Sequence, residues 1–348
     1  MFLALKEMKK EKTRFTMIIL TTALIAYLVF FLSSLAYGLA QINKTAIDLW
    51  DAEGVVLSKD ANGNVLSSFY RRPEADWADD LEVLKLENAV AYLDKDTQEE
   101  TPINFVVMHI ETEGRLMAPI TQGRQIENED EIILSQTILD KVDLALNDKI
   151  KLTNTDKTYT IVGLSEDANF NTVPVAYLQY KFDDSQHPAE VISALVNFNE
   201  DFKLTDTDYK YYDIDSFINN LPGYKAQVLT FSLMIISLSL VATIIIGIFM
   251  YILTMQKKAI FGVLKIQGYK NGYIMNSVMM QTFIVVTLGV ALGFVLTQLT
   301  LVFLPPSVPV AINAFLYLAV TLFIIISSLV GALFSALSIL KIDPLDSI

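Results

Sequence analysis

Residues that commonly do catalytic chemistry are scarce in this sequence of 348 residues. It contains no cysteine and two histidines, His109 and His187, which do not stand at a zinc-ligand spacing. No Gly-Lys dipeptide occurs, so there is no P-loop to hold nucleotide phosphates, and no nucleophile elbow is present. These absences predict a protein that is not an enzyme and that has no permanently bound cofactor or metal.

The charged residues are divided unevenly along the chain. Residues 42–225 contain 16 Lys and Arg against 35 Asp and Glu, a net charge of −19, whereas the rest of the chain contains 10 against 4, a net charge of +6. Apolar residues make up 53% of the sequence, a composition typical of membrane proteins. The pattern predicts one acidic domain inserted into a membrane scaffold with basic flanks, and no nucleic-acid partner.

Three long segments without charged residues predict the membrane spans. Two of them, 15–43 and 226–256, are each long enough to cross a bilayer once, and the first exceeds the apolar region of about 7 to 15 residues in a signal peptide. The third, 271–340, would be about 105 Å long as one helix, so it must fold back near its central prolines. The predicted spans are therefore 15–41, 226–256, 271–303 and 312–340. The prolines at the fold are Pro305, Pro306 and Pro309.

Lysine and arginine residues gather on two of the short segments that flank these spans. Because such residues mark the cytoplasmic side, residues 1–14 and 257–270 are both predicted to be cytoplasmic. Both chain termini, including the tail 341–348, then lie inside the cell, and residues 42–225 and the loop 304–311 lie outside it. The basic residues are Lys6, Lys9, Lys10, Lys12 and Arg14 before the first span, and Lys257, Lys258, Lys265 and Lys270 after the second.

The inserted domain is predicted to be α+β. Residues 132–134 predict a strand, and Ser135 predicts the N-cap of a short helix over 138–145. A second helix is predicted over 81–91. Strands are predicted over 105–110 and, as a hairpin, over 149–153 and 158–163. The acidic pairs of this domain could bind a cation weakly, but such pairs are common on solvated surfaces and no loop has calcium-site spacing; they are Asp79 with Asp80 and Asp183 with Asp184.

The third span contains Gly289 and Gly293 at the GxxxG spacing, which allows two helices to approach closely. The contact could lie within one subunit or at a seam between two.

Two segments carry the most specific motifs of the sequence. Residues 256–269 read QKKAIFGVLKIQGY, and the tail 341–348 reads KIDPLDSI. Both resemble the signatures of the FtsX/MacB-type (type VII) ABC transporter permeases, and the order of one span, a large inserted domain and three further spans is similar to MacB topology. The resemblance implies a homodimer of the permease with two copies of a separate ABC ATPase subunit, which binds the ATP and drives the outer domains mechanically.

In that family a short cytoplasmic helix after the second span contacts the ATPase. The amphipathic pattern of residues 257–270 agrees, because one apolar stripe with Phe261, Leu264 and Gly268 could face a partner. An ordinary membrane-surface anchor in contact with lipid would show the same pattern. Residues 1–14, which are predicted to form an amphipathic cytoplasmic helix, have the same ambiguity. The predicted coupling residues are Ile260, Phe261, Gly262, Leu264, Lys265 and Gly268.

Within this family the chain is most similar to the haem-exporter branch, the HrtB-type permeases of Gram-positive bacteria. Residues 1–7, 35–40 and 221–227 carry that likeness. It implies haem as the transported ligand, entering from the membrane between two copies of the second span. A haem groove needs aromatic or thioether surface, an axial ligand and a cation near the propionates. The predicted haem-contacting residues are Tyr224, Lys225, Phe231, Met234, Tyr37, Phe30 and Phe31.

Each of these side chains has a simpler explanation, because tyrosines form belts at membrane interfaces and Met and Phe pack within spans. Two other functions also fit the sequence. One is export of a peptide, an antibiotic or a lipid by the same mechanism, and the other is FtsX-like activation of a cell-wall hydrolase across the membrane.

Overall fold

The computed structural model describes residues 2–73, 76–93, 102–111, 113–139, 142, 144–153, 157–180, 191–305 and 308–337, without the side chains of residues 2–5, 93 and 335. The predicted tail motif in 341–348, Pro306, His187 and the pair Asp183 with Asp184 lie outside these residues. The chain divides into two compact units, which we describe separately. Unit 1 comprises Met1–Gly38 and Leu229–Ile348, and unit 2 comprises Leu39–Val228.

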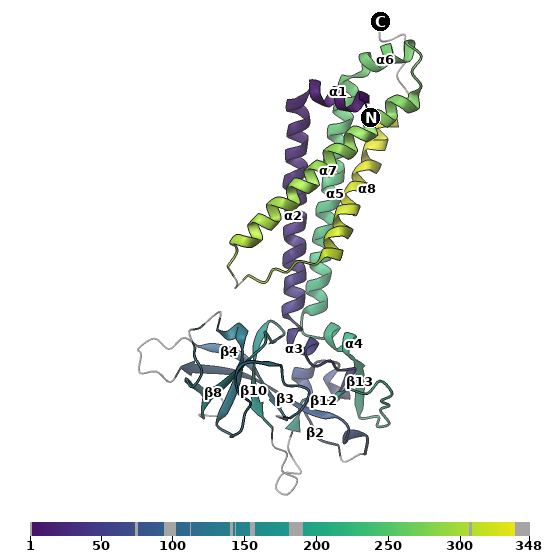
Figure 1. The fold of residues 1–348 in the computed structure, drawn as a ribbon. Helices are drawn as coiled ribbons and strands as arrows, with labels where there is room; N and C mark the ends of the chain where they lie inside the picture. Colours follow the sequence, from purple (N-terminus) through teal and green to yellow (C-terminus); the bar gives the residue numbers. More distant parts are fainter. Residues whose placement is uncertain are drawn as a thin grey trace. The chain divides into compact units, whose positions relative to one another are not determined.

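The described residues include four long apolar helices, as the sequence predicts (Figure 1). Three of them have 31 or 33 residues, which at 1.5 Å per residue is about 45–50 Å and enough to cross a bilayer core. The protein therefore has a membrane α-helical scaffold with an inserted domain. The four helices are α2 (Lys12–Ile42), α5 (Tyr224–Gln256), α7 (Asn271–Phe303) and α8 (Ala314–Leu337).

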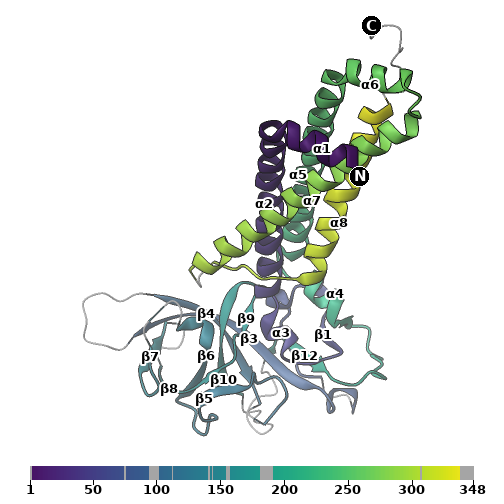
Figure 2. The ribbon, with the colours of Figure 1, turned by 45° about the horizontal axis from the view of Figure 1, so that its top comes forward.

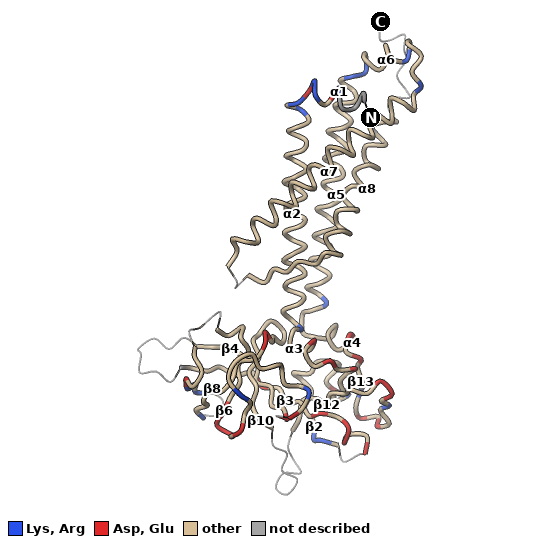
Figure 3. Tube along the Cα trace, in the orientation of Figure 1, with Lys and Arg blue, Asp and Glu red and all other residues tan. Residues whose placement is uncertain are grey.

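Two short helices lie at one end of unit 1 (Figures 1 and 2). Helix α1 (Phe2–Lys10) precedes α2, and α6 (Lys258–Ile266) lies between α5 and α7. Lysines of α1 and of the α6 region make this end of the unit basic (Figure 3). The pattern agrees with the predicted gathering of positive charge on residues 1–14 and 257–270.

The GxxxG glycines of α7 pack against α2 of the same chain. A Cβ built on Gly289 would lie 2.6 Å from the Cβ of Thr22, and one built on Gly293 would lie 2.7 Å from the carbonyl oxygen of Ala23. Only a residue without a side chain fits at such separations. The structure therefore places this motif at a contact within one subunit.

The connection between α7 and α8 is attached to α2. Helix α7 ends before Leu304, whose extended backbone (φ −74°, ψ 139°) is the conformation favoured before a proline. Further along, the amide of Ala311 donates to the carbonyl of Ser34 at 3.2 Å. A Cβ on Gly38 would clash with the carbonyl oxygen of Pro309, so the connection also lies directly on the backbone of α2.

Unit 2 is built on a large mixed sheet (Figure 1). The pairs β4 with β10 and β6 with β8 are parallel, and the other neighbours along the sheet are antiparallel. In spatial order the strands are β13 (Tyr209–Asp213), β1 (Gly54–Ser58), β12 (Ala194–Asn197), β3 (Glu82–Leu93), β4 (Ile103–Ile110), β10 (Val173–Gln179), β6 (Glu131–Ser135), β8 (Thr158–Ser165) and β5 (Ile120–Gly123).

Shorter elements complete this unit. Strand β7 pairs with β3 and β8, β9 pairs with β10, and β2 and β11 form a separate two-stranded sheet. These elements are β7 (Lys149–Leu152), β9 (Asn169–Phe170), β2 (Tyr70–Arg71), β11 (Val191–Ile192), helices α3 (Thr45–Asp48) and α4 (Ile214–Asn219), and the 3₁₀ helices η1 (Lys59–Ala61), η2 (Val65–Ser67), η3 (Asp76–Ala78) and η4 (Gln136–Ile138).

Both faces of the sheet are covered. On β4, Met108 belongs to the apolar cluster on one face, while Phe105 and Val107 belong to another cluster on the opposite face. This alternation confirms the strand predicted over 105–110. The predicted strand over 132–134 and the hairpin of β7 and β8 are confirmed as well.

Two predicted helices of this unit are wrong. Residues 81–91 lie mostly in β3, because their apolar side chains belong to clusters on different sides of the strand: Val83 to one, Leu84 to a second and Ala89 to a third. The helix predicted over 138–145 is the single turn η4, which Ser135 caps as expected by accepting from the amide of Thr137. Residues 140, 141 and 143 of that prediction lie outside the described part of the chain.

Candidate functional site

Helix α5 begins with a tight turn that the sequence Leu-Pro-Gly-Tyr encodes. Gly223 has φ +80°, and the amide of Tyr224 donates to the carbonyl of Leu221 at 3.1 Å. Proline followed by a glycine with positive φ is the pattern of a type II turn. Leu221 is buried and Tyr224 packs against the same apolar cluster of unit 2, while Lys225 is exposed. The turn therefore holds the Tyr224 side chain partly buried against the core of unit 2 and leaves the Lys225 side chain exposed.

The next predicted contacts lie on the part of α5 that belongs to unit 1. Phe231 is half-buried, and Met234 is 49% exposed. In its most apolar stretch α5 is 22% buried against 44% for α7, so α5 presents the larger uncovered apolar surface. The exposed apolar residues beside these two are Leu229, Leu233, Ile236, Leu240 and Val241.

The aromatic residues predicted on the first span have different environments. The ring of Phe30 is 1% exposed and lies 5.9 Å from that of Phe294 and 5.2 Å from that of Tyr317, centre to centre. Packing against these two rings explains the position of Phe30 in this structure, and its contact with a ligand stays a prediction. Phe31 stacks on Tyr27 and is half-buried, as is Tyr37.

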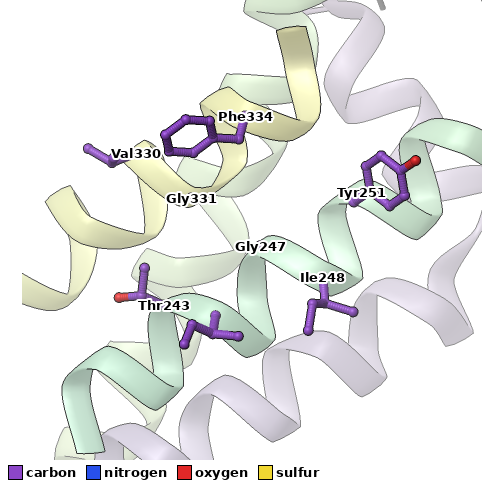
Figure 4. A pocket seen from close by; sticks show the side chains of 8 residues that line it. Thr243, Gly247, Ile248, Tyr251, Val330, Gly331 and Phe334 are labelled. Carbon is purple, nitrogen blue, oxygen red and sulfur yellow. The ribbon is translucent and has the colours of Figure 1, made fainter. Parts of the chain in front are cut away.

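A groove between α5 and α8 was not predicted (Figure 4). Its volume is about 520 Å³, within the range of small-molecule sites. It forms where Gly247 and Gly331 allow the helices to approach, and the hydroxyl of Thr243 donates to that of Ser327 at 2.8 Å beside it. Gly247 and Gly331, each within a predicted span, are the feature of the sequence that could have indicated a close approach of these helices. The lining residues are Thr243, Ile244, Gly247, Ile248, Tyr251, Val330, Gly331 and Phe334.

Helix α6 turns its predicted contact face inward. Phe261 is 1% exposed and belongs to the apolar core of unit 1, and Leu264 packs against that core. The helix is apolar on two sides, and in this structure these two residues occupy the inner one, so their part in coupling to an ATPase stays a prediction. The outer side carries Ile260, Val263 and Ile266, which are 50%, 45% and 53% exposed.

The glycine pattern of the α6 motif has a structural explanation. Gly268 has φ +86°, its amide donates to the carbonyl of Lys265, and the amide of Tyr269 donates to that of Leu264. This pair of bonds is the Schellman motif that ends helices at a left-handed glycine. Gly262 is buried and Lys265 half-buried. The motif thus fixes where α6 ends and in which direction the chain enters α7.

One carboxylate of unit 2 is strongly perturbed. Glu131 is 6% exposed and accepts from the guanidinium of Arg124 at 2.6 and 2.8 Å, and from the amides of Glu127 and Asn128. These donors, the guanidinium first, hold the pKa of Glu131 far below its usual range. The pair is structural, because it closes the loop between β5 and β6.

The other charged residues that the structure describes in unit 2 give no sign of a metal site. Among the described residues no group of three His, Asp or Glu side chains could hold a metal ion. His109 pairs with Glu87 at 3.3 Å, and Asp79 and Asp80 lie exposed in a turn. Acidic residues are spread over the loops and strand ends of the unit (Figure 3).

Comparison with known proteins confirms the resemblance to FtsX/MacB-type permeases. Residues 232–344 match the family model described as FtsX-like permease C-terminal. Over 100% of the chain and 99% of the relative, the sequence is 26% identical to the putative hemin transport system permease protein HrtB of Staphylococcus epidermidis, and 25% identical to that of Staphylococcus haemolyticus. An uncharacterized ABC transporter permease of Mycobacterium tuberculosis is 22% identical over 99% of the chain and 98% of the relative.

Two solved structures resemble the chain weakly. The periplasmic region of MacB from Actinobacillus actinomycetemcomitans covers 50% of this chain and 94% of its own, with a TM-score of 0.35 and 8% identity. The extracellular domain of the noncanonic ABC-type transporter YknZ from Gram-positive bacteria covers 46% and 98%, with a TM-score of 0.32 and 10% identity.

Proposed function

We propose that this chain is the permease subunit of an ABC efflux complex that exports haem from the bacterial cell membrane. The observation that carries the proposal is its similarity, over the full length, to putative hemin transport permeases. The FtsX-like permease domain, the four apolar helices and the inserted unit support the same mechanism.

In this proposal the chain hydrolyses no ATP itself. A separate ABC ATPase subunit, present in two copies on a homodimer of the permease, docks on the outer side of α6 through Ile260, Val263 and Ile266. Because α6 packs on the core of unit 1 through Phe261, force applied to it reaches the long helices directly. The basic end of unit 1 is the cytoplasmic end, and unit 2 lies outside the cell.

Haem contacts the exposed apolar face of α5 near its start. Met234 supplies thioether surface, Phe231 aromatic surface, and Tyr224 and Lys225 a phenol and a cation. Phe31 and Tyr37 of α2 remain proposed contacts, and Phe30 is left out because it is enclosed. The groove between α5 and α8 is a second apolar surface on the same helix.

The proposal is tested by the ATPase rate of the purified complex with haemin, compared with a panel of peptides and lipids. We expect stimulation by haemin above the panel, and haemin hypersensitivity in a deletion strain that the wild-type chain rescues. Drug sensitivity with unchanged haem tolerance would instead indicate export of a peptide or antibiotic. Failure of daughter cells to separate would indicate activation of a cell-wall hydrolase.

A further inference from the structure

A buried charged cluster connects α1, α6 and α7 at the basic end of unit 1. The ammonium group of Lys257 lies 3.2 Å from a carboxylate oxygen of Glu7, with their side chains 5% and 14% exposed. Lys257 occupies the N-cap position of α6, and Glu7 lies in α1. Lysine is rarely buried unless it is paired, so the carboxylate of Glu7 offsets the cost of burying the Lys257 ammonium group.

Two further residues complete the cluster. The side-chain amide of Gln281, on α7 and 2% exposed, donates to the same oxygen of Glu7. The ring of Phe15, on α2, lies 5.3 Å from the Lys257 ammonium, a cation–π distance. Glu7 therefore bridges the residue that starts α6 to α7, and Lys257 also touches α2.

A second polar contact joins the same helices. The guanidinium of Arg14, at the start of α2, donates to Gln256 at 2.6 Å. Gln256 is the last residue of α5 and directly precedes Lys257. The junction between α5 and α6 is thus held from two sides by residues of the N-terminal segment.

We propose that Glu7 is a positioning residue for α6: by binding Lys257 it fastens the start of α6 to α1 and α7, so that α1 and α6 move together. Resting on the proposed function, this assigns α1 a part in passing the movement of the ATPase subunit to α2, which begins two residues after α1 ends. A buried ion pair suits this purpose. If α6 moved away from α1, the pair would break and leave a buried charge without a partner, which makes the displaced position of α6 unfavourable.

The attachment is measured first on the full-length permease alone, without ATPase, nucleotide or haemin. Because the chain has no cysteine, Lys9→Cys and Gln267→Cys provide two unique and exposed spin-label sites, one on α1 and one directly after α6. We expect a narrow distance distribution with Glu7 present, and one that broadens towards longer distances with Glu7→Gln. The control is Lys10→Gln, which removes an exposed charge from the same helix and should leave the distribution unchanged. An unchanged distribution in Glu7→Gln would overturn the proposal.

Two double variants keep the test valid if Glu7→Gln folds poorly. Glu7→Gln with Lys257→Met removes both charges, which should restore folding but leave the distribution broad. Glu7→Lys with Lys257→Glu restores the pair in reverse, and the amide of Gln281 can accept instead of donate. The reversed pair should return the distribution to its narrow form; if the uncharged pair does so equally well, the ion pair is not the fastening.

The assembled complex then tests the part in coupling. In Glu7→Gln the ATPase should still co-purify and hydrolyse ATP, while haemin export per ATP falls about tenfold, and the reversed pair should recover it. Export per ATP that stays at the wild-type value despite a broadened distribution would overturn the coupling role. If wild-type protein exports no haemin, the proposed function fails while the distance measurement on the permease alone still decides whether Glu7 fastens α6.

Discussion

Gly293 of α7 lies so close to Ala26 of α2 that a Cβ on the glycine would be 2.8 Å from the Cβ of the alanine. The same added atom would lie 2.7 Å from a backbone oxygen of Ala23, and backbone cannot yield as a flexible side chain can. The contact between the two helices therefore depends on the absence of a single methyl group.

We expect Gly293→Ala to lower the stability of unit 1 by about 1–3 kcal/mol, the usual range for overpacking. Gly272→Ala is the control, because no atom lies within 4 Å of its added Cβ and alanine is favoured over glycine in a helix. Thermal unfolding in detergent, followed by the circular dichroism of the helices, measures both. A Gly293→Ala protein as stable as Gly272→Ala would contradict the close contact.

The two sides of α6 should respond differently to charge. Val263→Asp places a carboxylate on the exposed side, so we expect a folded permease that no longer co-purifies with its ATPase. Phe261→Asp buries an unpaired carboxylate in the core and should lower the yield of folded protein instead. Asn271→Asp, an exposed change at the start of α7, is the control for added charge. Co-purification that survives Val263→Asp would exclude this side as the docking surface.

Glu131 should make unit 2 sensitive to acid. Because its folded pKa is depressed, its stabilisation is fully present above the unfolded pKa of about 4.3 and is lost as the pH falls towards the folded value. Glu131→Gln should lower the free energy of unfolding by about 1.5–3 kcal/mol near neutral pH, and its difference from wild type should shrink below about pH 4.

Tryptophan fluorescence measures this effect in the full-length chain, because Trp50 and Trp77, the two tryptophans of the sequence, both lie in unit 2. A difference between Glu131→Gln and wild type that stays constant into acid would show that the carboxylate is not held in its charged form.

Haem binding should depend on the position of a methionine along α5. Met234→Ala should weaken haemin binding by about 2- to 10-fold, the range for loss of a sulfur–aromatic contact. Met255→Ala changes the same residue type at the other end of the helix, where the side chain is 38% exposed, and should have no effect. Absorbance titration of the purified complex compares them, and equal weakening would remove Met234 from the proposed surface.

The sequence predicted the scaffold well because membrane spans follow from a simple rule. Charge is expensive in a bilayer, so runs without Lys, Arg, Asp or Glu mark spans whatever their neighbours are. The strand β3 was missed because both of its faces are covered. Val83 and Leu84 are adjacent and both buried, which removes the alternation that marks a half-buried strand and leaves a pattern that fits a helix equally well.

The candidate sites were harder to predict for a related reason. In α6, Ile260 and Phe261 are consecutive apolar residues on different sides of a short helix, and periodicity cannot tell which side is covered. Phe30 and Phe31 pose the same question in α2, where one ring is enclosed and its neighbour is half-exposed. Glu7 carried no signal by itself, because its partner Lys257 is 250 residues away in sequence.

The bond from Ala311 to Ser34 gives the α7–α8 connection a fixed point on the first span. A second contact lies one helical turn further along α2, where Pro309 rests on Gly38. The linker between the last two spans is therefore tethered to the first span, and this end of α2 cannot leave the linker without breaking a backbone hydrogen bond.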